Sequence, residues 1–211
     1  MDTGTHITMG IALSGLALAD PVVAAQPTTH LAVITGVMVG SLIPDIDTVL
    51  KLKGSAIYIR NHRGITHSIP AVFLWPVLIT IVLTFLLPNA EPLHVLGWTW
   101  LAVFLHVFVD IFNSYGTQAL RPLANKWVAL SVINTFDPII FSMHLVAIFA
   151  WWVGTPPVPT MLTLLFFLIV YYILRFAFRR AVVNVVASSL AEGTDIFVAP
   201  TMRFFQWRVA A

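Results

Sequence analysis

Residues 93–112 read LHVLGWTWLAVFLHVFVDIF, and Asp110 is the one Asp, Glu, Lys or Arg among them. A helix of about 20 mostly apolar residues is long enough to span a bilayer. The whole chain has the same character: 59% of its 211 residues are hydrophobic and 9% are charged, against roughly a quarter charged in soluble domains. A water-soluble globular protein is thereby excluded, and the stretch is predicted to be a membrane span that carries His106 and Asp110 near its end.

Five further apolar segments indicate spans around this one. They run from about Ile7 to Ala19, His30 to Ile43, Ile69 to Leu87, Pro138 to Val153 and Met161 to Phe178, while the quoted span runs from Leu93 to about Phe112. The predicted fold class is therefore all-α: a polytopic membrane helix bundle of about six transmembrane helices. Residues 1–180 form the bundle. Residues 181–211 form an interfacial or cytoplasmic tail, helical to about Leu190 with a turn at Glu192–Gly193.

The charges predict an orientation. With six spans, all 11 Lys and Arg residues fall on or near the side that holds both termini, and the other side carries Asp20 and Glu91 without any Lys or Arg. The positive-inside rule makes the basic side cytoplasmic, so we expect a multi-pass protein of the plasma (inner) membrane. Membrane lipids are its expected partners and nucleic acid is not. Gly36 and Gly40 have the small-xxx-small spacing of helix interfaces, which permits a homodimer.

Ionisable groups at membrane spans are costly and therefore informative. Seven lie at the cytoplasmic ends of the predicted spans: His6, Asp45, Asp47, His62, His67, His106 and Asp110. His106 and Asp110 are four residues apart, which places them on one face of a helix. Asp45 and Asp47 follow a helix that ends at Pro44. Each piece has a structural alternative, because Asp-x-Asp is often a solvated turn and the His106/Asp110 pair could join helices by a hydrogen bond.

Together these seven residues predict a metal site that opens to the cytoplasm. Imidazole and carboxylate ligands without thiolate suit zinc, and also manganese or iron; the chain has no Cys. Seven candidate ligands exceed the needs of one tetrahedral ion, so we expect two divalent ions.

The motifs resemble those of the YdjM-like family of inner-membrane proteins, described as metal-dependent hydrolases. The resemblance rests on four segments in order over about residues 1–140: Thr5-His6, Leu42-Ile-Pro-Asp-Ile-Asp47, His62-Arg-Gly-Ile-Thr-His-Ser68, and His106-Val-Phe-Val-Asp110 followed by Asn113-Ser-Tyr-Gly-Thr-Gln118. It implies that the seven residues are metal ligands or their neighbours. The family in turn is similar to the zinc-dependent phospholipase C group, but the further His and His-xxx-Glu ligands of that group have no match here. Longer members continue past Trp207-Arg208-Val209, so the tail is expected to begin a further C-terminal portion.

The expected function is metal-dependent hydrolysis, with a phosphoester, including a phospholipid, favoured as the substrate. Asp45 or Asp47 would bridge the ions or act as general base, and Arg63 would bind a phosphate oxygen. Arg63 could instead be a positive-inside anchor. Thr66, Asn113, Tyr115 and Thr117 are expected to orient ligands or substrate, and Thr66 could also cap the helix that follows it.

Two other functions use the same ligands. A divalent-metal transporter would need polar groups near the middle of the membrane, where His144 is the main candidate. A membrane scaffold would bind metal without turnover.

Overall fold

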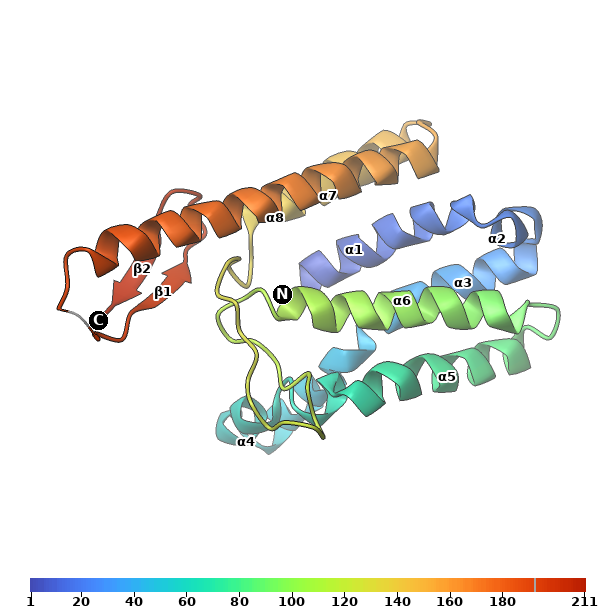
Figure 1. Cartoon of the computed structure of the whole chain (residues 1–211). Helices are drawn as coiled ribbons and strands as arrows, with labels where there is room; N and C mark the ends of the chain where they lie inside the picture. Colours follow the sequence, from blue (N-terminus) through green and yellow to red (C-terminus); the bar gives the residue numbers. More distant parts are fainter. Residues whose placement is uncertain (192) are drawn as a thin grey trace.

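The computed structural model describes residues 1–191 and 193–211, so Glu192 of the expected turn lies outside the described residues. A bundle of roughly parallel and antiparallel helices forms most of the molecule, and the C-terminal helix continues past one end of it (Figure 1). The long helices are α1 (Thr3–Leu16), α3 (Pro27–Gly40), α5 (Ile69–Leu86), α6 (Pro92–Asp110), α7 (Pro138–Trp152) and α8 (Pro157–Ala187). The short elements are η1 (Ala17–Ala19), α2 (Pro21–Ala25), η2 (Ile43–Lys53), α4 (Ser55–Asn61), η3 (Ile65–His67), β1 (Phe197–Pro200) and β2 (Trp207–Ala210).

Helices form at all six predicted apolar segments, and local sequence explains where they begin. A proline stands in the first turn of α3, α5, α6, α7 and α8, where its missing N–H removes no helical hydrogen bond. Asp137 caps α7 by accepting from the N–H groups of Ile139 and Ile140. The expected cap at Thr66 is wrong: Ser68 caps α5 instead, because its side chain is the one that accepts from Ala71 N.

Length and composition qualify three helices of the described chain as candidate membrane spans: α5, α6 and α8. The pair α3 and η2 qualifies as a fourth span if its bend of 43° lies within one crossing. The apolar segment Thr3–Ala19 and helix α7 are shorter. Six crossings and the side on which each terminus lies therefore stay predictions.

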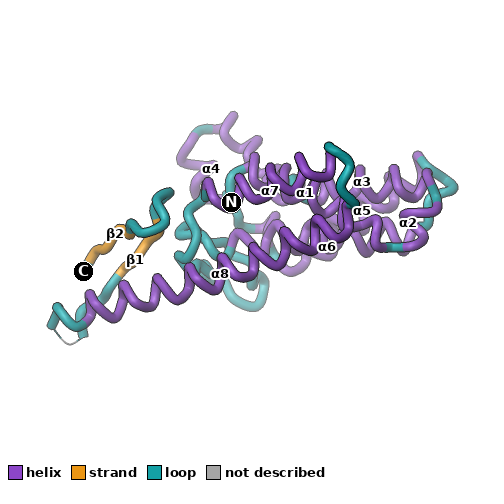
Figure 2. The backbone as a smooth tube through the Cα atoms, turned by 90° about the horizontal axis from the view of Figure 1, so that it is seen from above, coloured by secondary structure: helices purple, strands orange, loops and turns teal. Residues whose placement is uncertain are grey.

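One end of the bundle holds the basic segments. Helix α4, the loop between α6 and α7, and the extension of α8 all lie toward the same end (Figures 1 and 2). The opposite end is closed by Asp20, which caps α2 and accepts hydrogen bonds from His94 Nδ1 (2.6 Å) and Trp98 Nε1 (3.1 Å) of α6. This contact fixes the turn between α1 and α3 against α6.

The tail departs from the all-α prediction. Helix α8 ends at Ala187, and β1 and β2 then form a two-stranded antiparallel sheet in which Phe197 pairs with Ala210. Arg175 connects this tail to the bundle: its guanidinium donates to the carbonyl oxygens of Val132 (3.1 Å) and Phe204 (2.6 Å) and lies 4.3 Å from the Trp207 ring centroid. The all-α prediction is wrong here because short strands depend on such tertiary contacts.

Close packing of α3 on α6 uses the small residues that the sequence singled out. A side chain at Gly36 would overlap the Thr99 hydroxyl and come within 3.3 Å of Leu83, and one at Gly40 would lie 3.1 Å from the Thr99 carbonyl oxygen. The pair thus brings two helices of one chain together. The homodimer stays a prediction, and these two glycines are occupied within the chain.

We expect Gly36→Val to destabilise the protein by about 1–3 kcal/mol, since the added atoms force α3 away from α6. Gly97→Val is the matched control, because a Cβ at Gly97 meets nothing within 4 Å. Thermal unfolding in detergent measures both. Equal transition temperatures for the two variants would contradict this account of the α3–α6 contact.

Candidate metal centre

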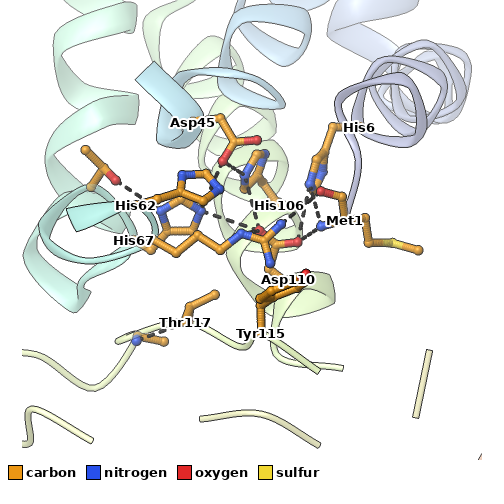
Figure 3. Close-up of polar contacts among 12 residues, drawn as sticks. Met1, His6, Asp45, His62, His67, His106, Asp110, Tyr115 and Thr117 are labelled. Carbon is orange, nitrogen blue, oxygen red and sulfur yellow. Dashed lines mark hydrogen bonds and ion pairs between the residues drawn. The ribbon is translucent and has the colours of Figure 1, made fainter. Parts of the chain in front are cut away.

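Four separate stretches of the chain meet at the end of the bundle that holds α4. His6 comes from α1, Asp45 from η2, His67 from η3, and His106 and Asp110 from the last turns of α6, and their side chains converge in Figure 3. All except Asp45 are buried, and Asp45 is partly buried. The predicted HxxxD pair therefore points into the protein and lies with groups from elsewhere.

Asp45, His67, His106 and Asp110 present four ligand atoms within 4.8 Å of one another. Nε2 of His67 lies 3.6 Å from Oδ1 of Asp45 and 3.5 Å from Oδ2 of Asp110. Nε2 of His106 lies 3.6 and 3.7 Å from the same two oxygens. These separations are too long for hydrogen bonds, but neighbouring ligands of a tetrahedral ion with bonds of about 2.0–2.1 Å lie roughly 3.3–3.4 Å apart. The four atoms thus have the spacing of a coordination shell.

Within the described part of the chain, these same four atoms are buried and form no hydrogen bond, although Oδ2 of Asp110 has an ion pair with Nε of Arg63. Buried polar atoms are nearly always paired, so a set of unpaired ones requires an explanation. A divalent cation fits this donor set, since two imidazole nitrogens and two carboxylate oxygens are ligands that zinc accepts.

The other ring nitrogen of each histidine is held by a polar partner. Nδ1 of His106 lies 2.6 Å from the carbonyl oxygen of Ser41, which can only accept, so Nδ1 carries the proton. The Thr66 hydroxyl donates to Oδ2 of Asp47 (2.9 Å) and therefore accepts from Nδ1 of His67 (3.0 Å). Both rings thus turn an unprotonated Nε2 toward the centre, as metal-binding histidines do. The pKa of His67 is lowered well below 6.5, mainly because burial removes the ring from water and also because the ring lies near His106.

Asp47 holds neighbouring residues of the site in place by hydrogen bonds and is not a free carboxylate. Its oxygens accept from His62 Nδ1 (2.7 Å), from the backbone N–H of Arg63 (2.9 Å) and from Thr66. Asp45, Asp47 and His62 also form a group of possible ligands within 4.8 Å of one another, but two of its members are already joined by that short hydrogen bond. The structure thus places the predicted ligands Asp47 and His62 beside the four-atom set and outside it.

Arg63 is buried, and its side chain points into the site. Its Nε lies 3.2 Å from Oδ2 of Asp110, and its Nη2 donates to the Met1 carbonyl oxygen (2.9 Å). The backbone of Arg63 has φ of 61°, a conformation uncommon for residues other than glycine; hydrogen bonds from its N–H to Asp47 and from Gln118 N to its carbonyl oxygen hold it there. Burial lowers the pKa of Arg63, and the Asp45 carboxylate opposes that shift. A surface anchor does not describe this residue.

A second set of atoms surrounds Oδ1 of Asp110. Nε2 of His6 lies 3.5 Å away, and the Met1 amino group contacts both Oδ1 and His6 Nε2. The His6 ring stacks on His106 with centroids 3.7 Å apart. The two oxygens of Asp110 therefore face two different sets of atoms. The two-ion hypothesis stays a prediction.

The residues after α6 are placed unequally. Asn113 accepts from the N–H groups of Tyr115 and Gly116 and donates to Oδ1 of Asp110 at 3.4 Å, so it shapes the loop beneath the site. Thr117 is buried and accepts from Ala119 N, which engages its hydroxyl within the loop. Tyr115 is 74% exposed.

Sequence reasoning missed two contributors, Ser41 and Met1. Ser41 acts through its backbone carbonyl, which any residue type would supply. The Met1 amino group is a main-chain group as well. Residue types carry no signal for either contact.

Residues 1–182 match the family model described as YdjM inner membrane protein. The chain belongs to the YdjM inner membrane protein family. A second family model, described as the YfhP middle domain, matches residues 191–211.

A curated relative agrees with this membership of the YdjM family. YfhP of Bacillus subtilis (strain 168), described as an uncharacterized protein, is 53% identical over 211 residues, which are 100% of this chain and 64% of the relative. No solved structure matches the chain. The chain is thus a membrane protein of the YdjM family.

We expect Thr66→Val to weaken metal binding by about 10–100-fold, because it removes the hydroxyl that orients His67. Thr163→Val, an exposed threonine of α8, is the control. Competition with a chromophoric zinc chelator in detergent measures both affinities. Unchanged affinity in Thr66→Val would show that His67 is not a ligand or is oriented by something else.

Proposed function

We propose that this protein is a membrane-embedded, metal-dependent hydrolase that acts on a phosphoester at the end of its helix bundle. The observation that carries the proposal is the set of four buried ligand atoms of Asp45, His67, His106 and Asp110, which form no hydrogen bond with the described residues and have histidine–carboxylate separations of 3.5–3.7 Å. The donor set favours zinc, with manganese or iron as alternatives. Nε2 of His6 lies beside the other oxygen of Asp110, but the Met1 amino group contacts both atoms, so a second ion is proposed on the number of candidate ligands alone.

The charge of the site also supports a divalent cation as its ligand. Asp45, Asp47 and Asp110 bring three negative charges to the site, and the Arg63 guanidinium and the Met1 amino group are the positive groups beside them. Uncompensated buried charge costs several kcal/mol, and a divalent ion supplies the missing positive charge. A bound ion of this kind supplies Lewis acidity, which makes water acidic enough to yield hydroxide near pH 7 and stabilises charge on a phosphoryl oxygen.

In this proposal the residues of the site have different roles. Asp45 is the better candidate to accept a proton from the attacking water, because the oxygens of Asp47 already accept from three donors. Arg63 keeps Nη1 buried and, among described residues, without a partner. A guanidinium in that state binds an anionic oxygen strongly. Asp47, Thr66 and Asn113 hold the ligands and the loops in place.

The transporter alternative has less support. The ligand set is confined to one end of the bundle, and His144, the polar residue expected nearer the middle, donates from Nδ1 to the carbonyl of Ile140 in its own helix. Zinc or manganese uptake into proteoliposomes would reverse this ranking. Stoichiometric metal without turnover of any phosphoester would identify the scaffold.

We expect the purified protein to bind a divalent metal and to hydrolyse bis(p-nitrophenyl) phosphate, and we expect His106→Gln to lose both properties. His30→Gln is the matched control at the other end of the bundle, since His30 lies in the first turn of α3. Metal content is measured by mass spectrometry and turnover by p-nitrophenol release. Full metal content in His106→Gln would refute the assigned site.

Arg63→Gln is expected to lower kcat about 10²–10³-fold, as loss of a donor to a transition-state oxygen does, while metal content is unchanged. Arg60→Gln, an exposed arginine of α4, is the control. If Arg63→Gln loses its metal instead, the role of Arg63 is to hold Asp110, and the assignment to substrate fails.

A further inference from the structure

An apolar cavity lies beside the metal centre. It has a volume of about 380 Å³ and is lined by side chains of α1, α6, α7 and α8. Its polar lining groups are engaged elsewhere: Thr5 donates to Asp2, His144 donates to Ile140 O, and the Tyr172 hydroxyl lies 4.0 Å from the Met1 sulfur. Apolar cavities of this kind hold water poorly, so a hydrocarbon is the better occupant.

The cavity opens sideways between α6 and α8. Phe108 of α6 and Ile169 and Ile173 of α8 line it and are 42%, 52% and 61% exposed. Both helices are candidate membrane spans. The exposed mouth therefore faces the region where lipid chains lie, and a chain can enter without crossing water.

The dimensions of the cavity suit hydrocarbon chains better than a helix. Along α8 the lining runs from Met161 to Phe176, which at 1.5 Å per residue is about 22 Å. All the space between the lining atoms, including the part open to the outside, is about 1210 Å³, so over that length the cross-section is at most roughly 55 Å². A helix of another protein, about 10–12 Å wide, needs roughly 80–110 Å². The cavity is thus too narrow for a helix, and it is longer than the roughly 15 Å depth of one hydrocarbon leaflet.

One end of the cavity reaches the metal centre. Met1 and Val109 line the cavity; the Met1 amino group contacts Asp110 and His6, and Val109 precedes Asp110. We propose that this cavity binds an acyl chain of a membrane lipid and thereby places the phosphate of its headgroup at the metal centre. This inference rests on the proposed function and narrows its substrate to a phosphoester that carries a long hydrocarbon chain.

Photolabelling tests the binding independently of turnover. The full chain is reconstituted in vesicles of phosphatidylcholine and phosphatidylglycerol that contain a phosphatidylglycerol with a diazirine in a 16-carbon acyl chain. Labelled peptides are then identified by mass spectrometry. We expect labels on the α1, α6 and α8 residues of the cavity, and at least a tenfold reduction in Leu164→Trp and Ile169→Trp, whose indole rings fill the cavity and its mouth. Leu162→Trp is the matched control, because Leu162 is 51% exposed and lies outside the cavity lining.

Equal labelling in all three variants, or labels spread over the outward faces of the helices, would overturn the inference. So would cross-links from the cavity to a second copy of the chain or to another protein. Ile169→Trp keeps the test valid if Leu164→Trp does not fold, because its position is half exposed.

Turnover separates this inference from the proposed function. Ile169→Trp is expected to lower hydrolysis of a long-chain phospholipid at least tenfold and to leave bis(p-nitrophenyl) phosphate hydrolysis unchanged. Equal effects on the two substrates contradict the cavity assignment while the hydrolase stands. Absence of hydrolysis by the metal-loaded parent protein contradicts the proposed function, and the photolabelling result still decides the cavity.

Discussion

Burial of the Asp110 carboxylate is the constraint on which the rest of this structure depends. A carboxylate removed from water without compensation costs several kcal/mol, and Asp110 has no exposed surface. Its two oxygens therefore need positive or hydrogen-bonding partners. Those partners come from the start of α1, from the loop after α4 and from α6 itself. A metal ion would be one such partner. The other partners come from distant parts of the chain, and their contacts with Asp110 bring those parts to one end of the bundle.

The surroundings of this centre are polar on one side and apolar on the other. On the side of η2 and α4, a network of short hydrogen bonds through Asp47 fixes the loop that carries His67 and Arg63. On the side of α8, the surroundings are almost entirely apolar. A ligand at the centre thus meets an ordered polar wall on one side and hydrocarbon on the other. This asymmetry is the basis on which we propose a ligand with a charged head and an apolar body.

Much of the site could be predicted from the sequence because its residues are costly in a membrane protein. The four-residue spacing of His106 and Asp110 fixed their common face, and the end of the apolar run before Pro44 placed Asp45 at the same end. Asp45 and Asp47 differ in their tertiary contacts. Oδ1 of Asp45 has no hydrogen-bond partner among the described residues, whereas the oxygens of Asp47 accept hydrogen bonds from a loop 15 to 19 residues further on. Spacing along the chain contains no information about that difference.

The features that the sequence did not predict have the same origin. The left-handed backbone in the loop before η3 is at Arg63 and not at the neighbouring Gly64, because hydrogen bonds to Asp47 and Gln118 impose it. The tail was expected to be helical to about Leu190, and no strand was predicted after that, but a hairpin forms where Arg175 and aromatic side chains hold it. In both places, contacts across the fold outweigh local propensity.

The break between α3 and η2 links the membrane part of the fold to the metal centre. In a continuous helix the carbonyl of Ser41 would accept from the N–H of residue 45, but that N–H donates to Leu42 instead, and the freed carbonyl holds His106. Irregular backbone at membrane depth is tolerated only where its polar groups find partners, and here the partner is His106 of the candidate metal centre. Straightening this helix would return the Ser41 carbonyl to a helical hydrogen bond and release the imidazole, so the bend and the orientation of His106 depend on each other.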